Sequence, residues 1–225
     1  MTIPIVEIFN SIEGEGKRAG RLCTFIRTAG CNLRCSFCDT PYSYNESEAV
    51  QMDIDEIIQQ VGLYDCDLIT LTGGEPLLHD EVREQLIPAL LQRGYQVNIE
   101  TNGSISLAGL REMILPEDIS SESLFFTMDW KCVSSHMNSK MLHENLAVLK
   151  SFDVLKFVVG SNVDLLEMYD ILQSHKIKAQ PYVSPVFGKI EMEQIVDFMK
   201  TKSLKDVKLQ CQLHKIVYEP NRRGV

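Results

Sequence analysis

Three cysteines stand close together near the start of the chain, at Cys31, Cys35 and Cys38. Their C-x3-C-x2-C spacing lets three sulfurs reach one centre, and thiolate is the ligand type that selects iron-sulfur clusters, zinc or Cu(I). A structural zinc site is closed by four ligands, and no fourth ligand stands beside these three. A [4Fe-4S] cluster bound by three cysteines leaves one iron open for a reacting ligand. The spacing therefore favours an iron-sulfur cluster, with a zinc site and three buried thiols as the alternatives.

The cysteines follow a β-like run, and β-like and helical patterns alternate along the rest of the chain. Strands are predicted at 22–28, 67–72, 96–100, 124–128, 154–159, 178–183 and 207–211. Helices are predicted at 52–61, 81–93, 107–115, 140–150, 163–174 and 191–200. This alternation predicts parallel strands joined by right-handed crossovers. About six such units and a last strand fall short of the eight of a closed barrel, so we expect an α/β fold with a partial, open (β/α)6 barrel.

The chain has 225 residues, of which 44% are hydrophobic, and a net charge of −9. This size allows a core of its own, so 1–225 is predicted to be a single domain. The negative charge argues against a nucleic-acid partner, which would need a basic surface. No signal pattern precedes Pro4, and no apolar run approaches the roughly 18 residues of a membrane span. Its seven cysteines fit a reducing compartment, and we expect a cytoplasmic protein with no membrane partner.

A glycine turn, Thr72-Gly73-Gly74-Glu75-Pro76, follows the second predicted strand. By itself this turn could be an ordinary one with a solvated glutamate. Polar residues also follow the third and fourth predicted strands, at Thr101-Asn102 and at Asp129-Trp130-Lys131. The carboxyl ends of parallel strands meet at one edge, where α/β proteins carry their active sites. These residues and the three cysteines are therefore predicted to share one site.

The cysteine spacing and the Gly-Gly-Glu-Pro turn, one strand-helix unit apart, together resemble the signature of the radical S-adenosylmethionine (SAM) superfamily. The resemblance implies the radical SAM type of barrel, a [4Fe-4S] cluster bound by Cys31, Cys35 and Cys38, and SAM at the open iron. No side chain is then catalytic, because the radical is generated on the cofactor. The residues that the resemblance assigns to SAM are Ser36, Phe37, Asp39, Gly74, Glu75, Thr101, Asn102, Asp129, Trp130 and Lys131.

Within the superfamily, features along essentially the whole chain resemble the family of 7-carboxy-7-deazaguanine synthases. These features are segment 11–16, Arg27, Cys38-Asp39-Thr40, segment 212–215, Pro220 and segment 222–225. The resemblance implies a carbon-nitrogen lyase that converts 6-carboxy-5,6,7,8-tetrahydropterin to 7-carboxy-7-deazaguanine with loss of ammonia. A 5′-deoxyadenosyl radical would abstract hydrogen from the substrate, and the ring would contract. This reaction belongs to queuosine and 7-deazapurine biosynthesis, and so to the supply of a modified purine for tRNA.

The same resemblance assigns a substrate site and a second metal. Thr40 would bind Mg²⁺, a hard cation that prefers oxygen ligands, and Arg27 offers a planar fork for the carboxylate of the pterin. Segment 1–21 would be an N-terminal extension that carries a substrate loop, and segment 212–225 a tail that closes the pocket. The family often has glutamine where Glu13 stands. The residues assigned to the substrate are Ile12, Glu13, Gly14, Arg27, Thr72, His214 and Pro220.

The expected partners are a small pterin substrate and, by resemblance, a flavodoxin or ferredoxin as electron donor. An incomplete barrel leaves one lateral side open, and self-association would cover apolar surface there, so we expect a homodimer. Two other functions remain open at this point. The chain could be a small glycyl-radical activating enzyme, which acts on a protein across an open barrel face, or a zinc-binding module without catalysis. The motifs at the two ends of the chain favour a small, closed pocket over a protein substrate.

Overall fold

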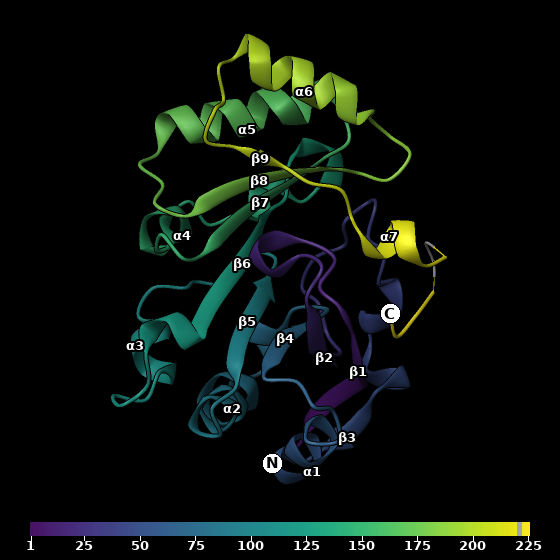
Figure 1. Cartoon of the computed structure of the whole chain (residues 1–225), viewed down its shortest axis with the longest axis vertical. Helices are drawn as coiled ribbons and strands as arrows, with labels where there is room; N and C mark the ends of the chain where they lie inside the picture. Colours follow the sequence, from purple (N-terminus) through teal and green to yellow (C-terminus); the bar gives the residue numbers. More distant parts are fainter. Residues whose placement is uncertain (220–221) are drawn as a thin grey trace.

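The computed structural model describes residues 1–219 and 222–225 and places their strands in one sheet (Figure 1). The nine strands follow the order β3-β1-β2-β4-β5-β6-β7-β8-β9. They are β1 (Ile3–Ile12), β2 (Leu22–Thr28), β3 (Val50–Met52), β4 (Leu68–Gly73), β5 (Gln96–Thr101), β6 (Leu124–Trp130), β7 (Val154–Val159), β8 (Gln180–Pro185) and β9 (Lys208–Leu209). β2 and β4 to β9 run parallel, whereas β1 runs antiparallel to β2 and β3. In the described part of the chain no pairing joins β3 to β9, so the sheet is an open, partial barrel, as predicted.

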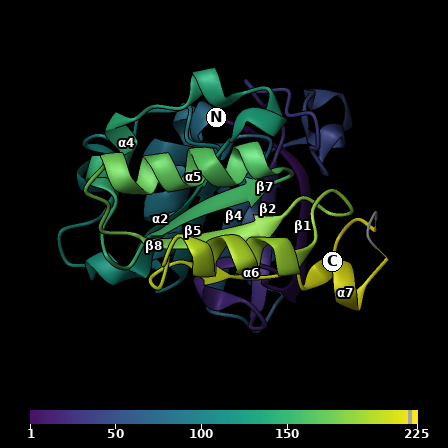
Figure 2. The ribbon, with the colours of Figure 1, turned by 90° about the horizontal axis from the view of Figure 1, so that it is seen from above.

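The helices are α1 (Ile54–Val61), α2 (Ile87–Gln92), α3 (Leu110–Ile114), α4 (Glu144–Val148), α5 (Asn162–Ser174), α6 (Met192–Thr201) and α7 (His214–Val217). Figure 1 shows α5 and α6 at the top, over β7 to β9, and α1 at the bottom beside β3. α7 and the C-terminus lie on the side of β1, and Figure 2 also places them opposite α4. The end of the chain therefore returns to the strand with which the chain begins.

Side chains alternate along the parallel strands between an apolar outer face and a polar inner face. In β4, Ile69 and Leu71 belong to the apolar core, and Thr70 stands between them. The Thr127 hydroxyl donates to Asn98 Oδ1 (2.9 Å), and Asn98 Nδ2 donates to the Thr70 hydroxyl (3.5 Å). The inside of the barrel therefore presents hydrogen-bonding groups and is suited to a polar ligand rather than to a second apolar core.

The N-terminal strand β1 is the main difference from the predicted fold, which begins with the parallel strand at 22–28. Polar residues, among them Glu7 and Asn10, interrupt the apolar alternation of β1, so that periodicity alone does not reveal a strand. Glu7 stands opposite Arg27 in the pairing of β1 with β2. Asn10 Nδ2 donates to the Thr24 hydroxyl (3.3 Å). Polar contacts thus join β1 to β2 where the apolar pattern fails.

Two predicted helices are irregular. The helix predicted at 81–93 begins with a turn of π-helix (Val82–Leu86) before α2. Pro88 has no N–H to donate to the preceding turn, which disfavours a continuous α-helix here. The prediction of a full helix at 140–150 is wrong, because only α4 is helical and Leu149 after it is extended. Neither change moves the strand ends that carry the predicted site.

A buried ion pair fixes α3 to the start of β7. Both carboxylate oxygens of Asp153 accept from Arg111 Nη2 (2.7 and 2.8 Å), and backbone N–H groups of Phe126 (2.9 Å) and Lys150 (2.7 Å) donate to the same carboxylate. Removing one partner of such a pair leaves a buried charge without compensation, which costs about 3–5 kcal/mol. We therefore expect Asp153→Ala to lower the free energy of unfolding by about 3–5 kcal/mol in urea denaturation.

The matched control is Asp197→Ala on α6. Asp197 pairs with Lys200 at 3.2 Å, and both side chains are exposed. Surface pairs of this kind contribute about 0–1 kcal/mol, so the control should unfold nearly as the unchanged chain does. Equal losses of stability in the two variants would contradict the role given to Asp153.

Candidate active site

A cavity of about 530 Å³ lies at the carboxyl edge of the parallel strands. Its walls come from the ends of β1, β2, β4, β5, β6 and β7, from the loop after β2 and from the tail. The fold thus brings strand ends, the cysteine loop and the C-terminal tail, which are far apart in the sequence, to one cavity. The roles assigned to their residues are predictions. The predicted site residues that line the cavity are Ile12, Glu13, Gly14, Arg27, Cys31, Cys35, Ser36, Phe37, Cys38, Asp39, Thr40, Thr72, Gly74, Thr101, Asn102, Asp129, Lys131 and His214.

Cys31, Cys35 and Cys38 are half-buried free thiols in the wall of this cavity. None of the other four cysteines lines it in the part of the chain that the structure describes. Burial raises the pKa of the Cys31 and Cys35 thiols, so a metal would have to displace their protons. Three sulfurs without a fourth cysteine suit a [4Fe-4S] cluster with one open iron better than a closed zinc site.

Hydrogen-bond donors point at the first of these sulfurs. The Leu33 N–H lies 3.4 Å from Cys31 Sγ, and Asn102 Nδ2 lies 3.8 Å from it. Asn102 Nδ2 also donates to Asn32 Oδ1 (3.1 Å), which fixes the orientation of the amide. Donors to a ligating sulfur are among the means by which proteins set the reduction potential of a cluster, so Asn102 would influence a cluster that Cys31 binds.

The turn after β6 holds the cysteine loop in place. Ser36 donates through its N–H to the Ser135 carbonyl (3.1 Å) and through its hydroxyl to the Ser134 carbonyl (2.5 Å). Asp164 of α5 accepts from the N–H of Ser134 (2.8 Å) and of Gly160 (2.7 Å). The loop that carries the cysteines is therefore anchored to α5 through this turn.

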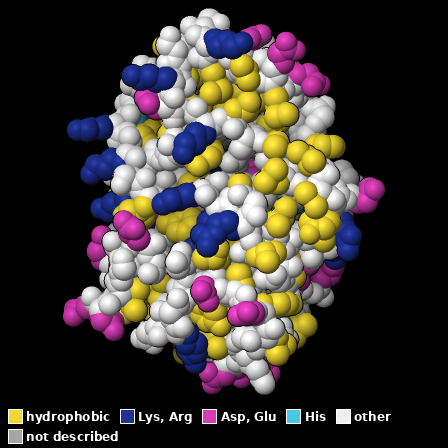
Figure 3. Space-filling model, viewed as in Figure 1, with side chains coloured by type: hydrophobic (Ala, Val, Ile, Leu, Met, Phe, Trp, Pro, Cys, Tyr) yellow, Lys and Arg dark blue, Asp and Glu magenta, His cyan; other side chains and the backbone are white. Residues whose placement is uncertain are grey.

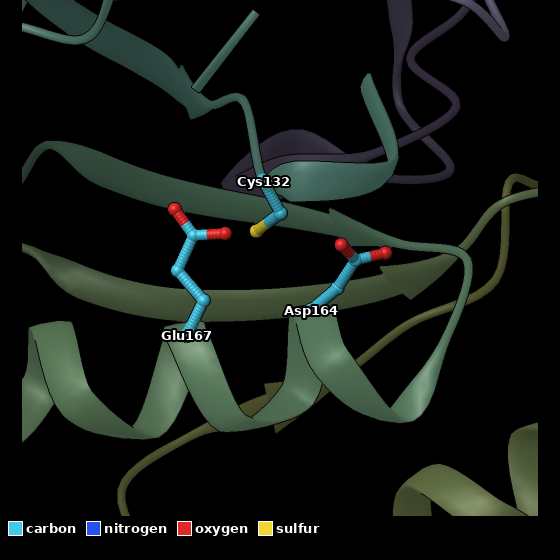
Figure 4. Close-up of side chains that lie close together, drawn as sticks. All are labelled: Cys132, Asp164 and Glu167. Atoms are coloured by element: carbon cyan, nitrogen blue, oxygen red, sulfur yellow. The ribbon is translucent and has the colours of Figure 1, made fainter. Parts of the chain in front are cut away.

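Cys132, Asp164 and Glu167 point toward one another beside this turn, in an arrangement that could hold a metal ion (Figure 4). The carboxylates are already engaged, however. Both oxygens of Asp164 accept from backbone N–H groups, as described above. Glu167 accepts from the Val133 N–H (2.8 Å) and from Trp130 Nε1 (3.4 Å). We therefore assign these side chains to support of the turn and not to a metal.

Glu75 is not among the residues that line the cavity, and its contact with SAM stays a prediction. The residue is 0% exposed. Its carboxylate accepts from the Thr101 hydroxyl (3.0 and 3.1 Å) and from the N–H groups of Asn102 (2.6 Å) and Leu77 (3.1 Å). Burial raises the pKa of Glu75 to about 7. Glu75 therefore ties the turn after β4 to the end of β5, and the glycine before it forms the wall of the cavity.

Trp130 also does not line the cavity, and its contact with SAM stays a prediction. The side chain is 2% exposed and packs in the apolar core. Successive residues of a strand face opposite sides of the sheet. Because Asp129 lines the cavity, Trp130 next to it must face the helices.

Arg27 faces the cavity from the end of β2. Its Nε donates to Glu7 Oε1 (2.7 Å), and the Tyr42 hydroxyl donates to the same oxygen (3.0 Å). Within residues 1–219 and 222–225, no hydrogen bond engages the two terminal nitrogens of Arg27. Glu7 thus orients the guanidinium group and leaves its outer N–H groups for an anion.

Three glutamates, Glu13, Glu15 and Glu100, also line the cavity. The Thr70 hydroxyl donates to Glu13 (2.5 Å), and the Thr72 hydroxyl donates to Glu100 (2.9 Å). Burial, and then the charge of Glu100, raise the pKa of Glu13 to about 8. Each of the three carboxyl groups offers an acceptor oxygen to a ligand that carries several N–H groups, and Glu13, with its pKa of about 8, also holds a proton at neutral pH.

Two lysines, Lys156 (buried) and Lys131 (half-buried), balance these acids. Lys156 Nζ lies 3.1 Å from Glu15 Oε2 and 3.0 Å from Asp129 Oδ1, and Lys131 Nζ lies 2.6 Å from Asp129 Oδ2. Burial alone would raise the pKa of Asp129, but the two ammonium groups hold it below its usual value. Burial likewise acts against ionisation of Glu15, and Lys156 helps to keep the pKa of Glu15 low.

Glu15, Glu100 and Lys156 are absent from the predicted site. Glu100 lies one residue before the end of β5 and Glu15 lies in the predicted substrate loop, so their positions alone were a usable signal. Lys156 interrupts an otherwise apolar strand, and a charge inside such a run indicates a buried partner. Its partners, Glu15 and Asp129, lie in two other segments of the chain, so the local sequence pattern does not identify them.

The tail lies against the cavity at two points. The His214 ring packs on Gly14, so closely that a Cβ at position 14 would overlap with it. Lys215 Nζ lies 3.1 Å from Asp39 Oδ2 in the cysteine loop. Pro220, a predicted substrate residue, lies outside the described residues. The described part of the tail therefore contacts both the predicted substrate loop, at Gly14, and the cysteine loop, at Asp39.

The sequence profile of the Radical SAM superfamily matches residues 25–116 of the chain. A 7-carboxy-7-deazaguanine synthase from Clostridium acetobutylicum is 44% identical to the chain, and the alignment covers 100% of both proteins. The chain belongs to the 7-carboxy-7-deazaguanine synthase family. A further member, from Methanospirillum hungatei, is 38% identical over 96% of this chain and 86% of that protein.

Solved structures agree in fold with this member of the synthase family. QueE from Escherichia coli superimposes with a TM-score of 0.75 over 95% of each chain, at 22% identity. SuiB from Streptococcus suis, bound to its precursor peptide SuiA, gives a TM-score of 0.57 over 86% of this chain and 49% of that one, at 14% identity. At these identities the likeness concerns the fold alone, and it confirms the open radical SAM barrel.

Membership of the synthase family decides between the functions that the sequence left open. The chain is a radical SAM enzyme and a lyase, with a [4Fe-4S] cluster and SAM as cofactors. A zinc-binding module without catalysis and a glycyl-radical activating enzyme are both excluded. Among the described residues, no helix combines the length and the apolar composition that crossing a bilayer would take.

Proposed function

We propose that the chain converts 6-carboxy-5,6,7,8-tetrahydropterin to 7-carboxy-7-deazaguanine with loss of ammonia, in queuosine and 7-deazapurine biosynthesis. The observation that carries this proposal is the 44% identity to a 7-carboxy-7-deazaguanine synthase over the full length of both chains. The cavity supports it independently, because its polar groups match the two ends of a carboxylated pterin.

The cysteines Cys31, Cys35 and Cys38 would hold the cluster, and SAM would occupy the adjoining part of the cavity. When bound, the cluster and SAM supply a 5′-deoxyadenosyl radical that takes hydrogen from the substrate. The protein's part is to bind and orient SAM and the pterin and to exclude water. The cavity-lining residues proposed for SAM are Ser36, Phe37, Asp39, Gly74, Thr101, Asn102, Asp129 and Lys131.

The charges in the cavity give the substrate one preferred orientation. The aminopyrimidinone half of a pterin carries N–H donors, which the carboxylates of Glu13, Glu15 and Glu100 can accept. Its carboxylate suits the outer N–H groups of Arg27. The pterin would therefore bind with its amino end toward the glutamates and its carboxylate toward Arg27. Ile12, Gly14, Thr72 and His214 complete the proposed substrate wall.

A magnesium ion at Thr40 belongs to the proposal as well. The Thr40 side chain lines the cavity and lies 3.7 Å from Cys38 Sγ. A hydroxyl oxygen is a fitting ligand for Mg²⁺, which would keep several waters and take a carboxylate oxygen of the substrate. Thr40 would thus place the cation between the cluster loop and the carboxylate end of the pterin.

We propose a flavodoxin or ferredoxin as the electron donor, a homodimer as the assembly and the cytoplasm as the location. The free thiols support a reducing compartment. Hydrophobic side chains are exposed on the face shown in Figure 3, and Phe187, Ile216 and Val217 are among the exposed apolar residues of the chain. Covering such surface favours self-association.

The direct test is an anaerobic assay with reconstituted enzyme, dithionite, SAM, Mg²⁺ and 6-carboxy-5,6,7,8-tetrahydropterin. Mass spectrometry should detect 7-carboxy-7-deazaguanine and 5′-deoxyadenosine. If SAM is cleaved and the deazaguanine never forms, the radical SAM assignment stands and the proposed substrate is wrong.

Replacing Arg27 should weaken binding of the pterin. The guanidinium group is proposed to hold the substrate carboxylate, and a hydrogen bond to a charged group contributes about 1.5–3 kcal/mol. We expect Arg27→Met to raise the KM for the pterin by about tenfold to a hundredfold. Steady-state kinetics at saturating SAM measures this change.

Arg93→Met serves as the matched control, because Arg93 is exposed at the end of α2, away from the cavity. It should leave the KM unchanged, and both variants should retain full iron content. An unchanged KM in Arg27→Met would show that another group holds the carboxylate.

A further inference from the structure

Lys156 is a lysine inside the barrel to which the proposed reaction assigns no role. It lies in the middle of β7, its side chain is 7% exposed, and it lines the cavity. Burying an ammonium group is costly unless partners compensate for the lost water. Its partners, Glu15 and Asp129, come from the loop after β1 and from the end of β6. A cation is thus placed where two parts of the active site meet.

On one side, Lys156 holds the loop that follows β1. Glu15 accepts from Lys156 Nζ (3.1 Å), from the Ser184 hydroxyl (3.0 Å) and from Gln212 Nε2 (3.4 Å). Of these donors only Lys156 carries a charge, so it makes the strongest of the three contacts. The position of Glu15, and of the proposed substrate loop around it, therefore depends on this lysine.

On the other side, Lys156 holds Asp129, whose second oxygen binds Lys131 Nζ (2.6 Å). The charges alternate from Glu15 through Lys156 and Asp129 to Lys131. Lys131 and Cys35 line the same cavity. A series of ionic contacts thus runs from the substrate loop to Lys131, which shares the cavity wall with the cluster loop.

We propose that Lys156 is a positioning residue for the reaction: it fixes Glu15 against Asp129 and so sets the distance between the pterin and the bound SAM. This inference rests on the proposed function. Hydrogen transfer depends steeply on geometry, since a misplacement of about 1 Å can cost about 10²-fold in rate. A loosened substrate loop should therefore let SAM be cleaved without transfer to product.

The test compares Lys156→Met with the unchanged enzyme, both loaded with cluster and SAM. We expect at least a tenfold higher KM for the pterin and more 5′-deoxyadenosine per 7-carboxy-7-deazaguanine, with unchanged iron content and SAM affinity. Lys156→Arg, which keeps the charge, should recover part of both losses. Lys200→Met, at an exposed position of α6, should behave as the unchanged enzyme does.

The pH dependence separates this role from a purely structural one. The titratable groups around Lys156 are Glu13 and Glu15 after β1, Glu100 on β5, Asp129 on β6 and His214 on α7, with Lys131 beyond Asp129. Lys156 lowers the pKa of Glu15, so its loss raises that pKa and Glu15 gains a proton at a higher pH. In Lys156→Met the KM should therefore rise as the pH falls, over a range in which the KM of the unchanged enzyme stays level.

Glu15→Gln provides a second variant that keeps the buried lysine paired with Asp129. It should reproduce the higher KM and the excess of 5′-deoxyadenosine, without the new pH dependence. If either variant loses thermal stability while its KM and product ratio stay unchanged, Lys156 is only structural and the inference is overturned. Absence of product from the unchanged enzyme would instead refute the proposed function. In that case the rate of SAM cleavage would be the same with and without the pterin, and the inference about Lys156 would fail with it.

Discussion

Replacing Cys31, Cys35 or Cys38 by alanine is expected to abolish the iron-sulfur cluster and with it all synthase activity. The three thiols line one cavity, and no other cysteine of the described chain lines it with them. With two sulfurs left, the cluster loses one of its three anchors and has no replacement nearby. Iron and sulfide should fall from about four of each per chain to near zero after anaerobic reconstitution, and the brown colour should be lost.

Cys66→Ala is the matched control for this loss. Its thiol donates to the carbonyls of Leu22 (3.4 Å) and Leu68 (3.6 Å), at the opposite ends of β2 and β4 from the cysteine loop. The control should therefore reconstitute fully and cleave SAM at the normal rate. A full iron content in Cys31→Ala, or a colourless unchanged protein with stoichiometric zinc, would refute the assignment of the three ligands.

The parallel strands were predictable because they are buried on both faces. β2 and β7 have the predicted bounds, and both are short runs rich in apolar and β-branched residues. β1 escaped prediction because Glu7, Asn10 and Ser11 interrupt its apolar pattern, and because its antiparallel pairing with β2 depends on tertiary contacts. Sequence periodicity indicates which residues are buried against an apolar core. β1 is stabilised in part by polar contacts, such as the ion pair of Glu7 with Arg27, which periodicity does not indicate.

The site was predictable where residues close together in the sequence, or the ends of neighbouring strands, determine it. Three cysteines within one loop must come together, and strand ends must meet at one edge. Strand alternation predicts that the neighbours Asp129 and Trp130 face opposite sides of the sheet, and the structure places only Asp129 at the cavity. The burial of Glu75 was not predictable, because its partners Thr101 and Asn102 lie at the end of another strand. Lys156 was missed because its partners Glu15 and Asp129 lie in other segments of the chain.

Gly74→Ala is expected to cause the second large loss. Gly74 follows β4 where the backbone passes the cysteine loop, and the Gly74 N–H donates to the Thr28 carbonyl (3.0 Å). A Cβ at position 74 would overlap with the Gly30 carbonyl oxygen and would lie 2.9 Å from the Cβ of Cys31. These are mostly backbone atoms, so relief requires the cysteine loop itself to move away from β4. SAM and the cluster would then lose their shared wall.

A shift of about 1 Å in such a site can cost about 10²-fold in rate, so we expect Gly74→Ala to reduce turnover by at least about that factor. SAM affinity, measured by equilibrium dialysis, should fall with it, because the glycine forms the wall of the proposed SAM site. Gly62→Ala is the control: Gly62 ends α1 with φ −65°, which alanine adopts freely, and its added Cβ would lie 3.3 Å from the Ile58 carbonyl oxygen. Normal turnover and SAM affinity in Gly74→Ala would show that the cysteine loop can move away from the end of β4 without loss of function. The close approach of these two segments would then not shape the SAM site.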